Sequence, residues 1–268
     1  HRDLHSFPTR RSSDLPLLGG VISDYFGVRQ VFFVVAGLCF LSSLVVIFFV
    51  KEKKREPNFA QKTSGLSSSI SYVLKNFEMK QMLLFIALSQ TAIVISSPIF
   101  AYYLEKLGTP NEYLATITGF MVAIVGLLTT IFGPIWGKKN DSQYYKKTLQ
   151  FALPFFGLSI LLQGFVSYYI YIFPLRIVMG IFSGAIIPVL FGALSKISPE
   201  NMRGSIMGLA SSATIFGNLL GPISCSIVSN NLGMEWTFIL GGILMLSVYL
   251  ISKYYCASST IISIPLNQ

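Results

Sequence analysis

Seven long apolar stretches alternate with polar connections along this chain of 268 residues. Each stretch is about 20 residues long, which is the length that a helix needs to cross roughly 30 Å of hydrocarbon with its backbone groups paired internally. The stretches cover residues 31–50, 82–104, 115–136, 148–168, 170–194, 205–228 and 236–254. This pattern predicts an all-α integral membrane protein that crosses the membrane several times.

The charged residues give this protein a predicted orientation. The chain is 53% hydrophobic and 12% charged, with a formal net charge of +9, and its basic residues gather in alternate connections. They are Lys51, Lys53, Lys54, Arg55, Lys62, Lys138, Lys139, Lys146, Lys147, Lys196, Arg203 and Lys253. The opposite connections hold only Arg29 and Lys106. The positive-inside rule therefore predicts a multi-pass protein of the cell membrane with a cytoplasmic C-terminus. Because the charges are spread over several loops, we expect no nucleic-acid partner.

Side chains suited to catalysis or metal binding are scarce. The only histidines are His1 and His5, and the three cysteines at positions 39, 225 and 256 have neither metal nor redox spacing. No apolar stretch contains an acidic residue. We therefore expect no enzyme activity, no metal and no cofactor.

The first residues differ in character from the rest. Residues 1–15 resemble the in-frame translation of a DNA sequencing adapter, and we leave this adapter-derived artefact out of the fold prediction. The native part then starts at Pro16, and we expect that an N-terminal part of the protein is missing. Residues 16–24 are typical of the end of a helix that reaches the outer side, and residues 25–29 of a turn.

One long polar segment, residues 51–80, divides the apolar stretches and is predicted to be a cytoplasmic linker. In its second half, one helical face gathers the apolar residues Leu66, Ile70, Val73, Leu74 and Phe77, with Ser and Lys opposite. This face predicts a short helix lying along the membrane surface. A flexible linker is the alternative, chiefly for residues 51–65.

An internal repeat links the beginning of the chain to its end. The segment from Pro16 aligns without gaps on the segment from Pro222, and the matched positions are Pro16/Pro222, Ser23/Ser229, Gly27/Gly233, Phe32/Phe238 and Leu38/Leu244, with Asp24/Asn230 similar. Two parallel six-helix halves would give such a repeat. Residues 16–50 would then end the N-terminal bundle with helices five and six. Residues 81–255 would form the C-terminal bundle of helices seven to twelve, and residues 256–268 a cytoplasmic tail.

A glycine pattern marks the stretch at 205–228. Gly217 and Gly221 lie one helical turn apart, so a neighbouring helix can approach their face at backbone contact, and Pro222 permits a bend. Gly208 extends the pattern to G-x8-G-x3-G-P. Ordinary packing of membrane helices is the alternative interpretation.

With these residues the chain resembles the C-terminal half of a major facilitator superfamily transporter, of the twelve-helix drug:proton antiporter type. Gly208, Gly217, Gly221 and Pro222 match the helix-eleven echo of that family's antiporter motif, and residues 16–20 match the tail of its helix-five copy. The resemblance implies a secondary transporter that works by alternating access and exports drugs or similar lipophiles, coupled to an inward flow of protons. Its implied partners are a small lipophilic or cationic substrate, protons, membrane lipid and the missing N-terminal half. The chain alone is expected to be inactive. A metabolite or sugar carrier of the same fold is the alternative, and a membrane scaffold or sensor is the non-transport alternative.

A second match is the loop motif after the stretch at 115–136. Gly137 and Asp141 are in register with the family's G-x-x-x-D-x-x-G-R-K pattern, whereas Tyr144 and Tyr145 replace its glycine and arginine. Asp141 is expected at a helix N-terminus, either as part of a gating latch or as a solvated cap.

The resemblance also suggests a cavity wall, because helices seven, eight, ten and eleven face the centre of this fold. The candidates for substrate contact are Gln90, Ser96, Tyr102, Phe120 and Asn218. Arg176 is the one charge well inside an apolar stretch, and such charges are functional candidates. It lies about two turns from the outer edge, so snorkelling outward or structural pairing competes with a role in transport.

Overall fold

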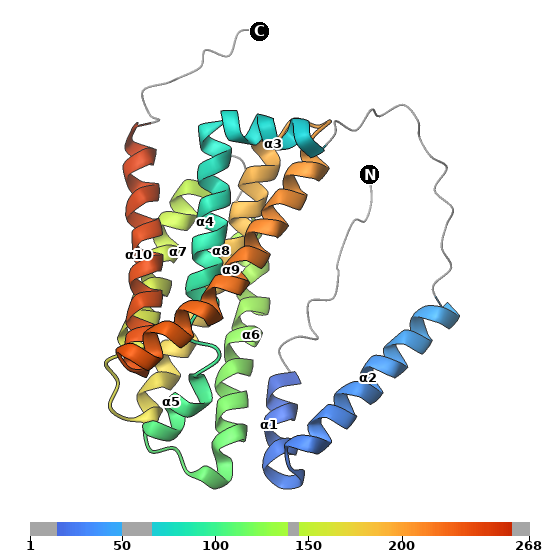
Figure 1. The fold of residues 1–268 in the computed structure, drawn as a ribbon, viewed down its shortest axis with the longest axis vertical. Coiled ribbons are helices and arrows are strands. Elements are labelled where there is room, and N and C mark those ends of the chain that lie inside the picture. The colour runs from blue at the N-terminus through green and yellow to red at the C-terminus, as the bar shows by residue number, and fades with distance from the viewer. Residues whose placement is uncertain (1–14, 50–65, 139–144, 259–268) are drawn as a thin grey trace.

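The computed structural model describes residues 15–49, 66–138 and 145–258, and these are almost entirely helical. In chain order the helices are α1 (Leu15–Phe26), α2 (Val28–Phe49), α3 (Leu66–Lys75), α4 (Phe77–Val94), α5 (Phe100–Lys106), η2 (Asn111–Tyr113), α6 (Leu114–Lys138), α7 (Tyr145–Gln163), η3 (Tyr169–Tyr171), α8 (Ile172–Ile197), α9 (Arg203–Asn231) and α10 (Met234–Ser258). Figure 1 shows the long helices from α4 onward standing side by side as one bundle. The all-α membrane fold is thus confirmed.

Six helices of the described part are long and apolar enough to cross a membrane, namely α2, α4, α6, α8, α9 and α10. The remaining predicted stretch, residues 148–168, forms α7. This helix carries Lys146 and Lys147 in its first turn and is not among the six. It nevertheless packs between α8 and α10. A Cβ on Gly242 of α10 would lie 2.4 Å from Cβ of Leu161, so α7 and α10 touch closely there.

The stretch predicted as one helix over 82–104 is broken. α4 starts earlier, at Phe77, where the Asn76 side chain accepts a hydrogen bond from Met79 N and caps the helix. It ends at Val94, and α5 starts only at Phe100. Pro98 lies in the gap and explains it, because proline lacks an N–H and disfavours the helical conformation of the residue before it. The prediction of a continuous helix was wrong at this point.

The core of the bundle is mostly apolar, although a few polar side chains and Arg176 are also buried in it. One cluster, which includes Met79, Ile86 and Phe156, fills the space between α4, α7, α8, α9 and α10. A second cluster around Phe100, Tyr103 and Phe238 fills the end of the bundle where α5 lies. This end carries the α1–α2 turn, and α3 and the C-terminal end of α10 lie at the opposite end (Figure 1).

α3 packs on α4 and α9 and therefore differs from a helix that only lies on lipid. Ser69 and Val73 are buried, and Val73 joins the core. Ile70, Leu74 and Phe77 of the predicted apolar face are exposed. The helix was predicted correctly, but its apolar face is divided between the bundle and the surroundings.

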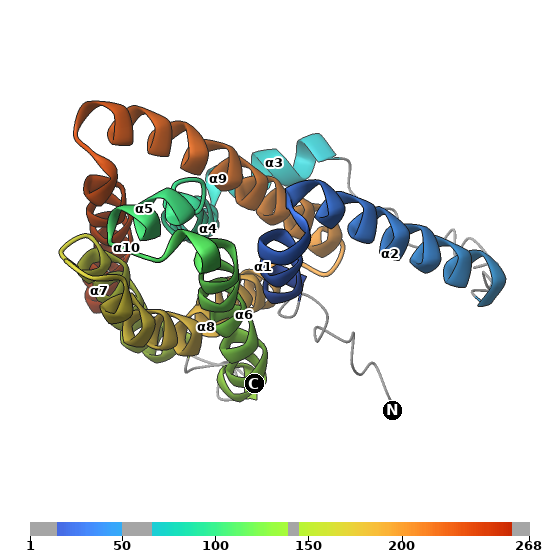
Figure 2. The ribbon, with the colours of Figure 1, turned by 90° about the horizontal axis from the view of Figure 1, so that it is seen from below.

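Of the two N-terminal helices, α1 lies beside α6 and α2 extends away from the bundle of α4 to α10, as the view from below shows (Figure 2). They are joined at Gly27, whose φ of 89° is a conformation that glycine adopts without strain. α1 packs on α6, whereas α2 packs on α1 and has none of its membrane-length segment buried.

Candidate substrate cavity and helix seams

The glycine face of α9 lies against α4. A Cβ on Gly217 would be 2.6 Å from the carbonyl oxygen of Ala87 and 2.8 Å from Cβ of Gln90, and a Cβ on Gly221 would be 3.3 Å from Ile95 N. Real Cβ atoms do not approach backbone as closely as at Gly217, so only glycine allows this seam. The two helices are thus in backbone contact over about one turn.

A polar pair crosses the same seam. Gln90 Nε2, about one turn before the end of α4, donates a hydrogen bond of 2.8 Å to Asn218 Oδ1, in the middle of α9. Asn218 is exposed and Gln90 is half-buried, so the pair lies on the outer face of this bundle rather than in its core. Polar side chains at membrane depth face a water-filled cavity or other protein, because contact with lipid is costly. This face of α4 and α9 is therefore a candidate cavity wall.

The exposed face continues along α9 on both sides of the pair. Gly208 is exposed, and no atom lies within 4 Å of the place where its Cβ would be. Ser211 and Ser212, one turn further on, are also exposed. Pro222 lies inside α9, and the helix continues through it to Asn231. The glycine motif thus has one covered part and one open part.

The other cavity candidates are not all on one surface. Tyr102 on α5 is 64% exposed, and Phe120 on α6 is exposed and stacks on Phe173 with ring centroids 5.7 Å apart. Ser96 is buried in the turn between α4 and α5. Among the predicted cavity residues, the structure shows direct contact only between Gln90 and Asn218 in the part of the chain that it describes.

Arg176 is buried inside the bundle, with 7% of its surface exposed. Its guanidinium carbon lies 3.7 Å from the ring centroid of Phe100, and Nε has no hydrogen-bond acceptor among the described residues. The contact with Phe100 agrees with the structural-pairing alternative, and a role of Arg176 in transport stays a prediction. Sequence reasoning did not find Phe100, since nothing in its spacing from Arg176 indicates contact.

The loop motif is described only in part. Gly137 is exposed in the last turn of α6, with no atom within 4 Å of its Cβ position. Asp141 and Tyr144 lie outside the described residues. The expected role of Asp141, as part of a gating latch or as a solvated cap, stays a prediction.

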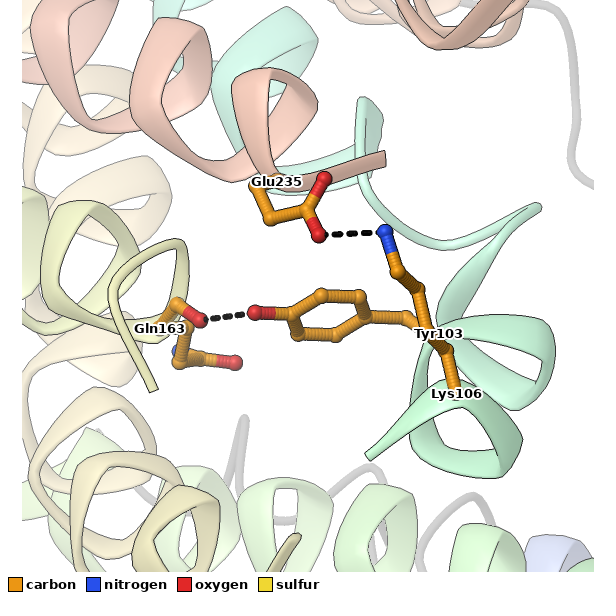
Figure 3. Close-up of polar contacts among 4 residues, drawn as sticks. All are labelled: Tyr103, Lys106, Gln163 and Glu235. Atoms are coloured by element: carbon orange, nitrogen blue, oxygen red, sulfur yellow. Dashed lines mark hydrogen bonds and ion pairs between the residues drawn. The ribbon is translucent and has the colours of Figure 1, made fainter. Parts of the chain in front are cut away.

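A polar cluster at the α5 end of the bundle was not predicted (Figure 3). Tyr103 Oη donates a hydrogen bond of 2.7 Å to the carbonyl oxygen of Gln163, the last residue of α7. Lys106 Nζ lies 2.6 Å from Glu235 Oε1, at the start of α10. The cluster therefore fastens α5 to α7 and α10. Lys106 was noted as one of two basic residues in the outer connections, which is the only signal that the sequence offered.

Removing the Tyr103 hydroxyl should weaken this fastening. Tyr103 is fully buried and its ring lies 4.5 Å from that of Phe238, so Tyr103→Phe keeps the packing and leaves one carbonyl without its donor. We expect a loss of about 1 kcal/mol in the free energy of unfolding. Thermal unfolding of the purified chain in detergent measures it. Tyr102→Phe, at the exposed neighbouring position, is the matched control and should leave the midpoint unchanged. Equal midpoints for all three proteins would contradict a structural role of the hydroxyl.

Comparison with known proteins agrees with this architecture. The chain matches the Major Facilitator Superfamily over residues 15–138 and 82–256. It is 29% identical over 224 residues to the uncharacterized MFS-type transporter YuxJ of Bacillus subtilis, covering 83% of this chain and 57% of that protein. It is 30% identical over 241 residues to the multidrug resistance protein MdtG of Dickeya zeae, covering 90% and 58%. It is 28% identical over 218 residues to the multi-drug resistance efflux pump PmrA homolog of Lactococcus lactis, covering 80% and 53%.

The chain therefore spans little more than half the length of these relatives. The family is one of transporters rather than enzymes, and the apolar helices make this a multi-pass membrane protein. The resemblance found in the glycine motif is confirmed over the whole helical part. The chain belongs to the Major Facilitator Superfamily.

Proposed function

We propose that the intact protein is a secondary active transporter of the cell membrane that exports drug-like lipophilic or cationic compounds. The observation that carries this proposal is the exposed Gln90–Asn218 pair at membrane depth, on a seam closed by Gly217. A face that combines this polar pair with exposed apolar side chains, such as Phe216 and Leu219 of α9, suits bulky, mostly apolar ligands. The multidrug names of MdtG and the PmrA homolog support the same substrate class.

Transport would proceed by alternating access, with two helix bundles rocking around a site at the membrane midplane. α4 to α10 are the C-terminal bundle in this proposal. The open face of α9, from Gly208 to Asn218, would meet the substrate and the other bundle. The tight α4–α9 seam would move as one body, because its backbone contact leaves no room for sliding.

The orientation follows from the basic residues. Helix ends carrying Lys146, Lys196, Arg203 and Lys253 lie at the end of the bundle marked by α3, and the connection with Lys106 lies at the opposite end (Figure 1). Under the positive-inside rule, this distribution supports a cytoplasmic α3 end and a cytoplasmic C-terminus.

Proton influx is the proposed energy source. Within the described ranges, the acidic residues lie at or near helix ends, as Asp24, Glu78 and Glu235 do. A carboxylate that titrates in the middle of the membrane would then come from the missing N-terminal half. This assignment follows the family resemblance and the charge pattern of this chain.

A metabolite carrier of the same fold is the second candidate, and Arg176 is the observation that favours it. A buried cation without a carboxylate partner among the described residues attracts an anionic group. A substrate with a carboxylate or phosphate could supply that group when the cavity opens.

Dye efflux tests the proposal. Cells that lack their own multidrug pumps would express either the intact gene or residues 16–268, and ethidium efflux would be followed with and without a protonophore. We expect efflux from the intact protein alone, abolished by the protonophore. Asn218→Leu should slow it about 3- to 10-fold through loss of the polar pair. Asn231→Leu, an exposed asparagine at the end of the same helix, should not. Robust efflux from residues 16–268 would overturn the two-bundle mechanism.

A further inference from the structure

The contact between α1 and α6 contains a carboxylate with a defined role. Asp24 Oδ2 accepts a hydrogen bond of 2.7 Å from Thr116 N, and Oδ1 accepts one of 3.2 Å from Ala115 N. Asp24 lies in the last turn of α1, and the two amides lie in the first turn of α6. A side chain more than 90 positions away thus caps α6.

This cap is a strong one in physical terms. The first N–H groups of a helix have no partner within it, so each needs an acceptor from elsewhere. A carboxylate also complements the positive end of the helix dipole, and hydrogen bonds to a charged acceptor are stronger than neutral ones. The two oxygens of Asp24 bind two adjacent amides, which fixes both the distance and the direction between α1 and α6.

The helices are in close contact directly beside the cap. Gly20 lies one turn before Asp24, and a Cβ there would be 2.4 Å from the carbonyl oxygen of Ala115. The hydroxyl of Thr116 is buried at this place and has no partner among the described residues. α1 therefore covers part of the start of α6, where Ala115 and Thr116 are half-buried and the side-chain oxygen of Thr116 is fully buried.

This contact crosses the boundary between the two bundles. The internal repeat assigns α1 to the N-terminal bundle and α6 to the C-terminal one. α1 continues at Gly27 into α2, which packs on α1 and not into the bundle of α4 to α10. The α1–α2 turn and the start of α6 lie together at the end of the molecule opposite α3 (Figure 1).

The structure assigns to Asp24 the role of a latch between the two bundles at the outer end of the transporter. The latch is made of the Asp24 carboxylate and the amides of Ala115 and Thr116. It holds while the outer end is closed, and it breaks when α1 leaves α6 and the outer end opens. This inference rests on the proposed alternating access. It adds Asp24 as the residue that sets the balance between the state with a closed outer end and the state with an open one.

A buried reporter on α6 tests the latch. Thr116→Cys, in a chain with Cys39, Cys225 and Cys256 replaced by serine, would be reconstituted in lipid nanodiscs and treated with a membrane-impermeant maleimide. With Asp24 intact we expect slow labelling, since α1 covers this position. Asp24→Ala should speed labelling about tenfold or more, because two charge-assisted hydrogen bonds are lost. Asp24→Asn, which keeps one acceptor oxygen, should give an intermediate rate.

Two controls separate opening from unfolding. Glu112→Gln removes an exposed carboxylate near the same helix start and should leave the rate unchanged. Ser89→Cys, fully buried on α4, should stay unlabelled in the Asp24→Ala background. If Ser89→Cys becomes labelled in that background, the Asp24→Ala protein has unfolded, and the labelling rate of the Asp24→Asn protein then tests the latch. Equal labelling at Thr116→Cys with aspartate, asparagine and alanine would overturn the latch. Because labelling needs no substrate or proton gradient, it can succeed where the dye assay of the proposed function fails.

Discussion

Gly217→Leu should destabilise the chain and abolish transport by the intact protein. A leucine side chain at this position would have to enter space that the backbone of Ala87 and the Cβ of Gln90 already occupy. Overpacking of cores costs about 1–3 kcal/mol, and here the obstacle is backbone, which cannot rotate away. α9 would be pushed off α4, and the Gln90–Asn218 hydrogen bond would break with it. The midpoint of thermal unfolding in detergent and the rate of ethidium efflux measure the two effects.

Gly208→Leu is the matched control on the same helix. The space next to Gly208 is open in this chain, and leucine favours a helix over glycine by up to about 1 kcal/mol. The purified chain should therefore be as stable as the parent or slightly more stable. In the intact transporter the same change should slow efflux, because the missing bundle is proposed to approach this face. If Gly217→Leu were as stable as Gly208→Leu, the close contact between α4 and α9 at Gly217 would be contradicted.

The membrane fold could be predicted from sequence because its main signal is local. A run of about 20 apolar residues is visible without knowing its neighbours, and all seven predicted stretches contain helices. The exception at Pro98 had a local cause too, but the apolar residues on both sides concealed the break. In α7 the lysines near its start make the helix less apolar, but it still packs closely on Gly242 of α10 as part of the bundle.

The candidate site could be predicted less well, because its contacts join distant parts of the chain. Gln90 and Asn218 were each chosen as polar residues at membrane depth, but their pairing depends on which helix lies against the glycine face. Asp24 was noted only through its match to Asn230, and its bond to α6 depends on the packing of two helices far apart in sequence. Composition and spacing carry no information on such contacts.

Replacing Phe100 should destabilise the protein strongly, whereas replacing its partner Arg176 should destabilise it less. Phe100→Leu removes the ring 3.7 Å from the guanidinium and leaves a buried cation without compensation. A desolvated cation–π contact contributes about 2 kcal/mol or more, so we expect a loss of at least that size in the free energy of unfolding. Arg176→Leu should cost less, because it removes the ring contact together with the cost of burying the charge. Thermal unfolding of the purified single variants measures both.

The double variant decides whether the two residues act as a pair. With both replaced by leucine, no charge is left uncompensated, so the protein should be more stable than Phe100→Leu alone, and the two losses should not add. Phe182→Leu, a ring on the same helix as Arg176 that stacks on Phe155 of α7 instead, is the control and should lose similar stability with either residue at position 176. Additive losses in the Phe100 cycle would contradict the pairing. Measuring efflux then distinguishes a structural role from a role in transport. If Arg176→Leu is stable but slows efflux by the intact protein tenfold, Arg176 acts on the substrate and Phe100 positions its guanidinium. If efflux is unchanged, the pair only holds α5 against α8.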